Sequence, residues 1–183
     1  MKRVFVLSAP SGTGKTTMAA RLKQEVPGLF IPVTYTTKNP RPEEVEGRDY
    51  HFVSREKFLE MIRLGEFLEW AEVYGNCYGT PRKEVEEQLK LGRKVLLTID
   101  TQGGLSVRRI FPQAFLVGLL PPSLAEQEGR IRKRSGLSEK EIRQRIEAAR
   151  IERRVLKEEY DIRLVNRNLE TTLEKIKKII TGK

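Results

Sequence analysis

Residues 9–16 form the first motif in the chain whose residue types and spacing suit a chemical role. They read APSGTGKT and match the phosphate-loop pattern G-x-x-x-x-G-K-[ST] at its second glycine, lysine and threonine, while Ala9 replaces its first glycine. In such a loop, backbone N–H groups wrap a β-phosphate, the lysine reaches the β- and γ-oxygens, and the hydroxyl ligates Mg²⁺. The alternative is a plain Gly-rich turn. We predict an ATP-type phosphate site made of Ala9, Pro10, Ser11, Gly12, Thr13, Gly14, Lys15 and Thr16.

A phosphate loop needs a strand before it and a helix after it, and the sequence predicts both. Residues 2–7 form a short β-branched, apolar run, and residues 15–24 read as a helix that Pro27 and Gly28 stop. Further apolar runs occupy residues 94–100, bounded by Gly103-Gly104, and residues 115–120. A weaker run at 161–165 precedes a helical pattern over 169–180. Strands that alternate with helices indicate a doubly wound α/β core with a parallel sheet.

The segment between the first helix and the run at 94–100 is too long to be a loop. Residues 32–90 are rich in threonine, tyrosine, proline and charge, with a helical stretch at 55–65 and a strand at 67–74. Connections of this length without structure of their own are uncommon in compact domains. We therefore expect an inserted subdomain.

The composition narrows the class of protein. The chain has 183 residues, 38% of them hydrophobic, with 35 Lys+Arg against 25 Asp+Glu and a net charge of +10. These values exclude the disordered and fibrous classes, and the longest apolar runs fall far short of the roughly 20 residues that span a bilayer. A single cysteine, Cys77, excludes an internal disulfide and fits a reducing compartment. We expect a cytoplasmic globular domain.

Several separate motifs resemble the guanylate kinase family. They are TYTTKNPRPEEVEGRDYHFV at 34–53, FLEWAEVYGNCYGTP at 67–81, IDTQG at 99–103 and PPS at 121–123, and they follow in collinear order over nearly the whole chain. The resemblance implies a P-loop NTPase-type doubly wound sheet with a mixed GMP-binding insertion and a helical lid. It places the core at 1–31, 92–122 and 146–183, the insertion at 32–91 and the lid at 123–145.

The resemblance also implies an acceptor site. It places Thr34, Glu69, Thr80 and Asp100 around the base of GMP and Lys38, Arg41, Tyr50 and Tyr78 around its phosphate, and it counts Glu44 among the GMP-binding residues. The chemistry is sensible, because guanine presents N1–H and an exocyclic NH₂ as neighbouring donors that one carboxylate accepts as a pair. Adenine does not present this pair of neighbouring donors to the carboxylate. An unpaired buried acceptor costs about 1–3 kcal/mol, which over two groups is enough to exclude AMP.

For catalysis the resemblance implies cations rather than a covalent nucleophile. Arg130, Arg134 and Arg145 match arginines that close over the phosphates, and we expect them to act with Lys15 and Arg41. Arg134 is expected on ATP as well, and Asn166 near the donor base. Mg²⁺ is expected on Thr16 and the nucleotide phosphates. The implied reaction takes the γ-phosphoryl group of ATP to GMP or dGMP and gives ADP and GDP, in purine nucleotide metabolism and GMP recycling.

Two residues depart from the family pattern. Thr98 stands where the family usually carries an acid two residues before Asp100, which removes one carboxylate near the magnesium. Lys38 stands where the family has arginine, which replaces a bidentate fork by a point charge. We expect slower turnover from the first change and weaker GMP binding from the second.

Three other functions are open. A catalytically weak or inactive guanylate-kinase-like binding module is one, but Lys15 and Thr16 of an intact phosphate loop weigh against it. The second is a kinase for another phosphorylated acceptor, which the departures at Thr98 and Lys38 suggest. The third, nucleic-acid binding through the positive charge, lacks a motif or an aromatic platform. We expect small-molecule partners, ATP and GMP, with no nucleic acid and no membrane; the sequence leaves monomer or homo-oligomer open.

Overall fold

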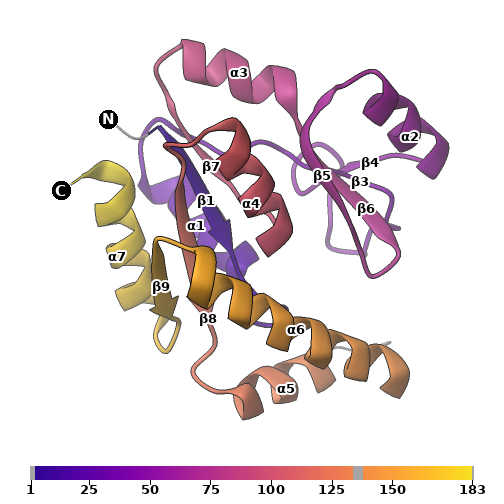
Figure 1. Ribbon diagram of the computed structural model, residues 1–183, viewed down its shortest axis with the longest axis vertical. Coiled ribbons are helices and arrows are strands. Elements are labelled where there is room, and N and C mark those ends of the chain that lie inside the picture. Colours follow the sequence, from indigo (N-terminus) through magenta and orange to yellow (C-terminus); the bar gives the residue numbers. More distant parts are fainter. Residues whose placement is uncertain (1–2, 134–137, 183) are drawn as a thin grey trace.

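A five-stranded parallel sheet forms the centre of the computed structural model, which describes residues 3–133 and 138–182 (Figure 1). In spatial order its strands are β2 (Leu29–Phe30), β7 (Lys94–Leu97), β1 (Val4–Ser8), β8 (Phe115–Leu120) and β9 (Ile162–Val165). Every residue of β1 is buried, as expected for a parallel strand covered on both faces. The predicted parallel α/β core is confirmed.

Helices cover both faces of this sheet, and β1 shows why. Its alternate residues face opposite ways: Phe5 and Leu7 join a cluster with α1 (Lys15–Glu25) and α7 (Leu169–Thr181), whereas Val4 and Val6 join a second cluster. The second cluster includes one buried residue from each of three further helices: α3 (Arg82–Lys90) with Val85, α4 (Thr101–Ile110) with Val107 and α6 (Glu139–Glu159) with Leu156. The sheet is therefore doubly wound.

The predicted boundary after β7 was wrong, for a local reason. The run at 94–100 reads as one strand, but β7 ends at Leu97 and Asp100 is the N-cap of α4. The Asp100 carboxylate accepts hydrogen bonds from the backbone N–H groups of Gln102 and Gly103. Gly103 and Gly104, which bound the apolar run in the sequence, lie inside the helix.

A second, four-stranded sheet makes up most of the insertion. Its order is β4 (His51–Phe52), β3 (Tyr35–Thr36), β6 (Asn76–Pro81) and β5 (Phe67–Val73). β3 pairs in parallel with β4 and antiparallel with β6, and β5 pairs antiparallel with β6. The predicted helix at 55–65 is α2 (Arg55–Arg63), which begins at the side-chain cap of Ser54. The sheet and α2 share a third small core of Phe58, Met61, Phe67 and Cys77.

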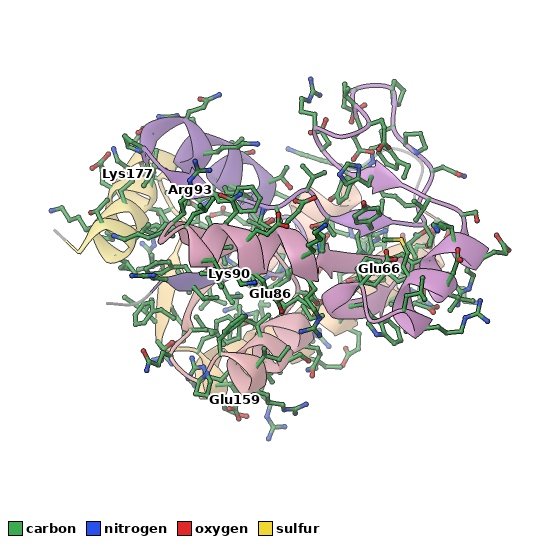
Figure 2. The ribbon with its side chains drawn as sticks, turned by 90° about the horizontal axis from the view of Figure 1, so that it is seen from above. Glu66, Glu86, Lys90, Arg93, Glu159 and Lys177 are labelled. Carbon is green, nitrogen blue, oxygen red and sulfur yellow. The ribbon has the colours of Figure 1, made fainter. Side chains whose placement is uncertain are left out.

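The insertion is tied to the central sheet by α3. This helix contacts both β5 and β7. Figure 2, seen from above, shows α3 with Glu86 and Lys90 between the α7 side of the molecule and the second sheet. The insertion therefore rests on the same sheet that carries the phosphate loop.

The region after β8 consists of α5 (Leu124–Arg132) followed by α6. A capping box between Ser138 and Glu141 starts α6, which then runs unbroken past residue 145, where the sequence places the end of the lid. Near its other end, Leu156 lies over Gly118 of β8, where an added Cβ would come within 2.9 Å of the leucine side chain. Within the described residues, no helix is long and apolar enough to cross a membrane.

Candidate active site

The phosphate loop lies between β1 and α1, and two glycines give it its shape. Gly12 and Gly14 have φ values of 82° and 94°, a region that favours glycine. Gly14 is the N-cap of α1, and among the described residues no side chain caps that helix end. Its first N–H groups therefore remain available to phosphate oxygens, and the helix dipole favours the negative charge there.

Side chains from distant elements hold the loop in place. Gln127 of α5 donates from Nε2 to the Ser11 carbonyl oxygen at 3.1 Å, and Asn166, just after β9, donates from Nδ2 to the Thr13 carbonyl oxygen at 3.0 Å. The Thr13 hydroxyl donates to the Pro10 carbonyl oxygen at 2.7 Å. Asn166 thus contacts the phosphate loop directly, and its role beside the donor base stays a prediction.

Lys15 reaches from the loop to the carboxyl end of β7. Its ammonium donates to the carbonyl oxygen of Ile99 at 2.8 Å and lies 3.5 Å from that of Thr98. Burial lowers the pKa of Lys15, and the carboxylates of Asp100, Glu152 and Glu69 oppose that shift. Because β1 and β7 are parallel neighbours, their carboxyl ends bring Lys15 and Asp100 together, at the edge where open α/β sheets bind ligands.

A buried pair, Glu69 and Thr80, faces this edge from the second sheet. The two residues are opposite each other on β5 and β6, and the Thr80 hydroxyl donates to Glu69 Oε1 at 2.5 Å. Burial raises the pKa of Glu69 to about 7, although the Thr80 hydrogen bond works against it. Glu69 Oε2 points at α4, where a Cβ on Gly103 would lie only 2.6 Å away. Glycine at 103 therefore makes the room that this carboxylate occupies.

A second polar cluster gathers Lys38, Glu44, Tyr50 and Tyr78. The Lys38 ammonium pairs with the Glu44 carboxylate and lies 4.8 Å from the centre of the Tyr50 ring. Burial alone would raise the pKa of Glu44, but hydrogen bonds from Lys38 and the Arg41 backbone lower it overall. Burial raises the pKa of Tyr50 to about 12, so its hydroxyl is a donor at neutral pH. Arg41 itself is exposed beside the cluster, and Thr34 lies immediately before β3.

Two of the three expected lid arginines lie within the described residues. Arg130 donates from Nη1 to the Gly12 carbonyl oxygen at 3.3 Å, so it touches the phosphate loop. Arg145 lies with its guanidinium carbon 4.3 Å from the centre of the Tyr74 ring, at the tip of the β5–β6 hairpin. Arg134 lies outside the described residues.

Sequence reasoning did not single out Glu152 of α6. Its Oε2 atom is buried with no hydrogen-bond partner among the described residues, and burial raises its pKa to about 7. The Lys15 ammonium acts against that shift, and Asp100 adds to it. The signal was present in the helical spacing, because Arg145, Ala149, Glu152 and Leu156 recur at steps of four, three and four residues on one face of α6.

A phosphate loop at the carboxyl edge of a doubly wound parallel sheet, with an inserted second sheet facing it, is typical of a P-loop nucleoside monophosphate kinase. Comparisons with known proteins agree. The guanylate kinase family profile matches residues 1–183. A guanylate kinase of Trichodesmium erythraeum is 45% identical over 97% of this chain and 95% of its own, and one of Dechloromonas aromatica is 44% identical over 97% and 87%. The crystal structure of guanylate kinase from Anaplasma phagocytophilum superposes with a TM-score of 0.81 at 32% identity, covering 99% of this chain and 85% of that one. The chain belongs to the guanylate kinase family.

Proposed function

We propose that the chain is the enzyme its family implies, an ATP:GMP phosphotransferase that converts GMP and ATP to GDP and ADP. It is a nucleoside monophosphate kinase of purine nucleotide metabolism. The observation that carries the choice of acceptor is the buried Glu69–Thr80 pair, which faces Asp100 and Lys15 across the gap between the two sheets. No observation favours a binding module or another acceptor.

Guanine recognition follows from the free oxygen of Glu69. Thr80 occupies Oε1, so Oε2 and the remaining lone pair of Oε1 are left to accept from N1–H and the exocyclic NH₂. Adenine offers an unprotonated N1 at the matching place, which would leave a buried carboxylate unpaired. Base selectivity is therefore assigned to Glu69, with Thr34, Thr80 and Asp100 completing the base site.

The acceptor phosphate is assigned to the polar cluster in the insertion. Tyr50 and Tyr78 donate from their hydroxyls, and Lys38 and Arg41 supply positive charge. Glu44 holds Lys38 and so sets where that charge sits. The set matches a monoester dianion, which accepts several donors at once.

Catalysis is assigned to positioning and charge neutralisation. Lys15 is expected to leave the Ile99 carbonyl and bind the β- and γ-phosphates, while Arg130 and Arg145 approach from α5 and α6. Preorganised cations of this kind stabilise the charge that spreads over the transferred phosphoryl group. No covalent intermediate is needed, because the acceptor phosphate oxygen attacks directly. Arg134 is assigned to the same group from the sequence.

Kinases of this family use ATP and generally need a divalent metal ion, and we assign Mg²⁺. The fit is chemical, because Thr16 is an exposed residue in the first turn of α1 and brings a hydroxyl oxygen. Among the described residues, no group of three or more His, Cys, Asp or Glu could hold a metal ion by itself. Mg²⁺ keeps several waters and is often held by one or two protein oxygens plus substrate phosphates. When bound, it neutralises phosphate charge.

The test is ADP release from ATP with GMP, AMP, CMP and UMP offered separately. Turnover with GMP alone is expected, and it should be lost in Lys15→Ala. Lys23→Ala is the matched control, since Lys23 is an exposed lysine on the same helix. Equal turnover with AMP would contradict the role of Glu69, and no turnover by folded wild-type protein would contradict the kinase assignment.

A further inference from the structure

The β5–β6 hairpin closes with an unusual residue at its tip. Val73 pairs with Asn76, which leaves a two-residue turn of Tyr74 and Gly75 with φ values of 51° and 79°. Two positive φ values mark the turn type that suits a hairpin, but the usual first residues there are asparagine, aspartate or glycine. A bulky L residue is strained in this conformation. Tyr74 therefore occupies its place at a cost to stability.

The ring of Tyr74 contacts an arginine on α6. The guanidinium carbon of Arg145 lies 4.3 Å from the ring centre, although the two residues are 71 positions apart in the chain, from 145 − 74. Figure 1 shows the hairpin pointing toward α6. Burial raises the pKa of the Tyr78 hydroxyl, and its hydrogen bond with Thr36 and the nearby Arg145 charge oppose that shift. Arg145 therefore stands close to a residue assigned to the acceptor phosphate.

The kind of contact sets Arg145 apart from its neighbours on the helix. Arg143, Arg150 and Arg154 each pair with a glutamate of α6 itself. Arg145 instead stacks on an aromatic face, and its Nε atom is buried with no hydrogen-bond partner among the described residues. A carboxylate would neutralise the guanidinium and occupy its N–H groups. An aromatic face holds the flat side of the group and leaves the N–H groups at its edge free for oxyanions.

We propose that Tyr74 is a positioning residue for phosphoryl transfer, which holds the Arg145 guanidinium by its face at the acceptor side of the site. The inference rests on the proposed function, because Arg145 matters there only as a phosphate-binding cation. Lys38 is already paired with Glu44, so Arg145 supplies a planar fork on this side that Lys38 does not. The strained turn at Tyr74 lowers the stability of the fold, and in return its ring fixes the position of the Arg145 guanidinium.

The test is a pair of substitutions that separates position from stability. Tyr74→Asn installs a preferred turn residue and removes the ring, so the melting temperature should rise while kcat falls about 3- to 30-fold, the range a cation–π contact corresponds to. Tyr74→Phe keeps the aromatic face and should keep kcat within about twofold of wild type. KM for ATP should stay unchanged in both. A purely structural role would not move melting temperature and kcat in opposite directions.

A double-mutant cycle shows whether the effect passes through Arg145. Arg145→Ala should lower kcat, and adding Tyr74→Asn to it should change kcat less than twofold. An equal loss in both backgrounds would overturn the proposal, as would unchanged kcat in Tyr74→Asn. A rise in kcat would mean that the ring holds Arg145 away from the phosphates, which also overturns it. Failure of the proposed function is seen separately, as wild-type protein without GMP-dependent turnover.

Discussion

Replacing Gly103 with alanine is expected to weaken GMP binding while the fold persists. The new Cβ would lie 2.6 Å from Glu69 Oε2, whereas ordinary contacts begin near 3.4 Å, so the carboxylate must move by 3.4 − 2.6, or about 0.8 Å. The Thr80 hydrogen bond holds Oε1 in place, so Oε2 takes the displacement. This is the oxygen assigned to guanine. Losing one hydrogen bond to a charged group costs about 1.5–3 kcal/mol, which is about 10- to 150-fold in KM for GMP.

The assay is the initial rate with GMP titrated at saturating ATP and Mg²⁺, and KM for ATP should not change. Isothermal titration with GMP alone measures the affinity without turnover. Gly129→Ala is the matched control, because a Cβ on that glycine of α5 meets nothing within 4 Å. An unchanged KM for GMP in folded Gly103→Ala, with Glu69→Gln strongly impaired, would refute the reasoning.

Three further outcomes are expected. Thr98→Asp should raise kcat a few-fold with little change in GMP affinity, and an unchanged kcat would show that the acid is dispensable. Lys38→Arg should lower KM for GMP by about tenfold, because a fork gains one charge-assisted hydrogen bond; a higher value would mean that the Glu44 pair tolerates only lysine. GMP needs Glu69 ionised, so with its pKa raised to about 7 by burial, affinity should fall as pH drops below 7, and isothermal titration should detect proton release on binding. Glu69→Gln should remove that release; if it does not, Glu152 or the GMP phosphate is its source. The stability of the free enzyme depends on pH in the opposite direction. The folded state holds the Glu69 proton more tightly than the unfolded state, so the contribution of Glu69 to stability is fully present below pH 4.5 and is lost as pH rises through about 7.

Sequence reasoning worked best where the signal is local. The strand at 115–120 and the strand–loop–helix at the phosphate loop follow from apolar runs and glycine spacing within a dozen residues. The two-residue strands β2, β3 and β4 are too short for any period to show. Their positions are set by pairing with partners far along the chain.

The start of α4 shows a second limit of prediction from sequence. Two adjacent glycines argue locally for a turn, yet Gly103 and Gly104 lie inside α4, where each faces a side chain from elsewhere that leaves no room for a Cβ. A Cβ on Gly104 would collide with the Tyr160 hydroxyl, which donates to Ser8 Oγ beneath the phosphate loop at 2.8 Å. Such glycines are explained by tertiary packing, which a single sequence does not display. Glu152 is an intermediate case: its place beside Ala149 and Leu156 can be read from the helical spacing, but its burial depends on what α6 packs against.

The packing of Leu156 against Gly118 also affects how far α6 can carry Arg145. It fixes α6 to the central sheet near one end, while Arg145 is carried 11 residues away, from 156 − 145, toward the other. At a rise of about 1.5 Å per residue this is a lever arm of about 16 Å, so a tilt of about 10° at this contact sweeps the guanidinium through about 3 Å. That is the length of one hydrogen bond. A tilt of this size about Leu156 would therefore be enough to make or break a contact between Arg145 and a phosphate.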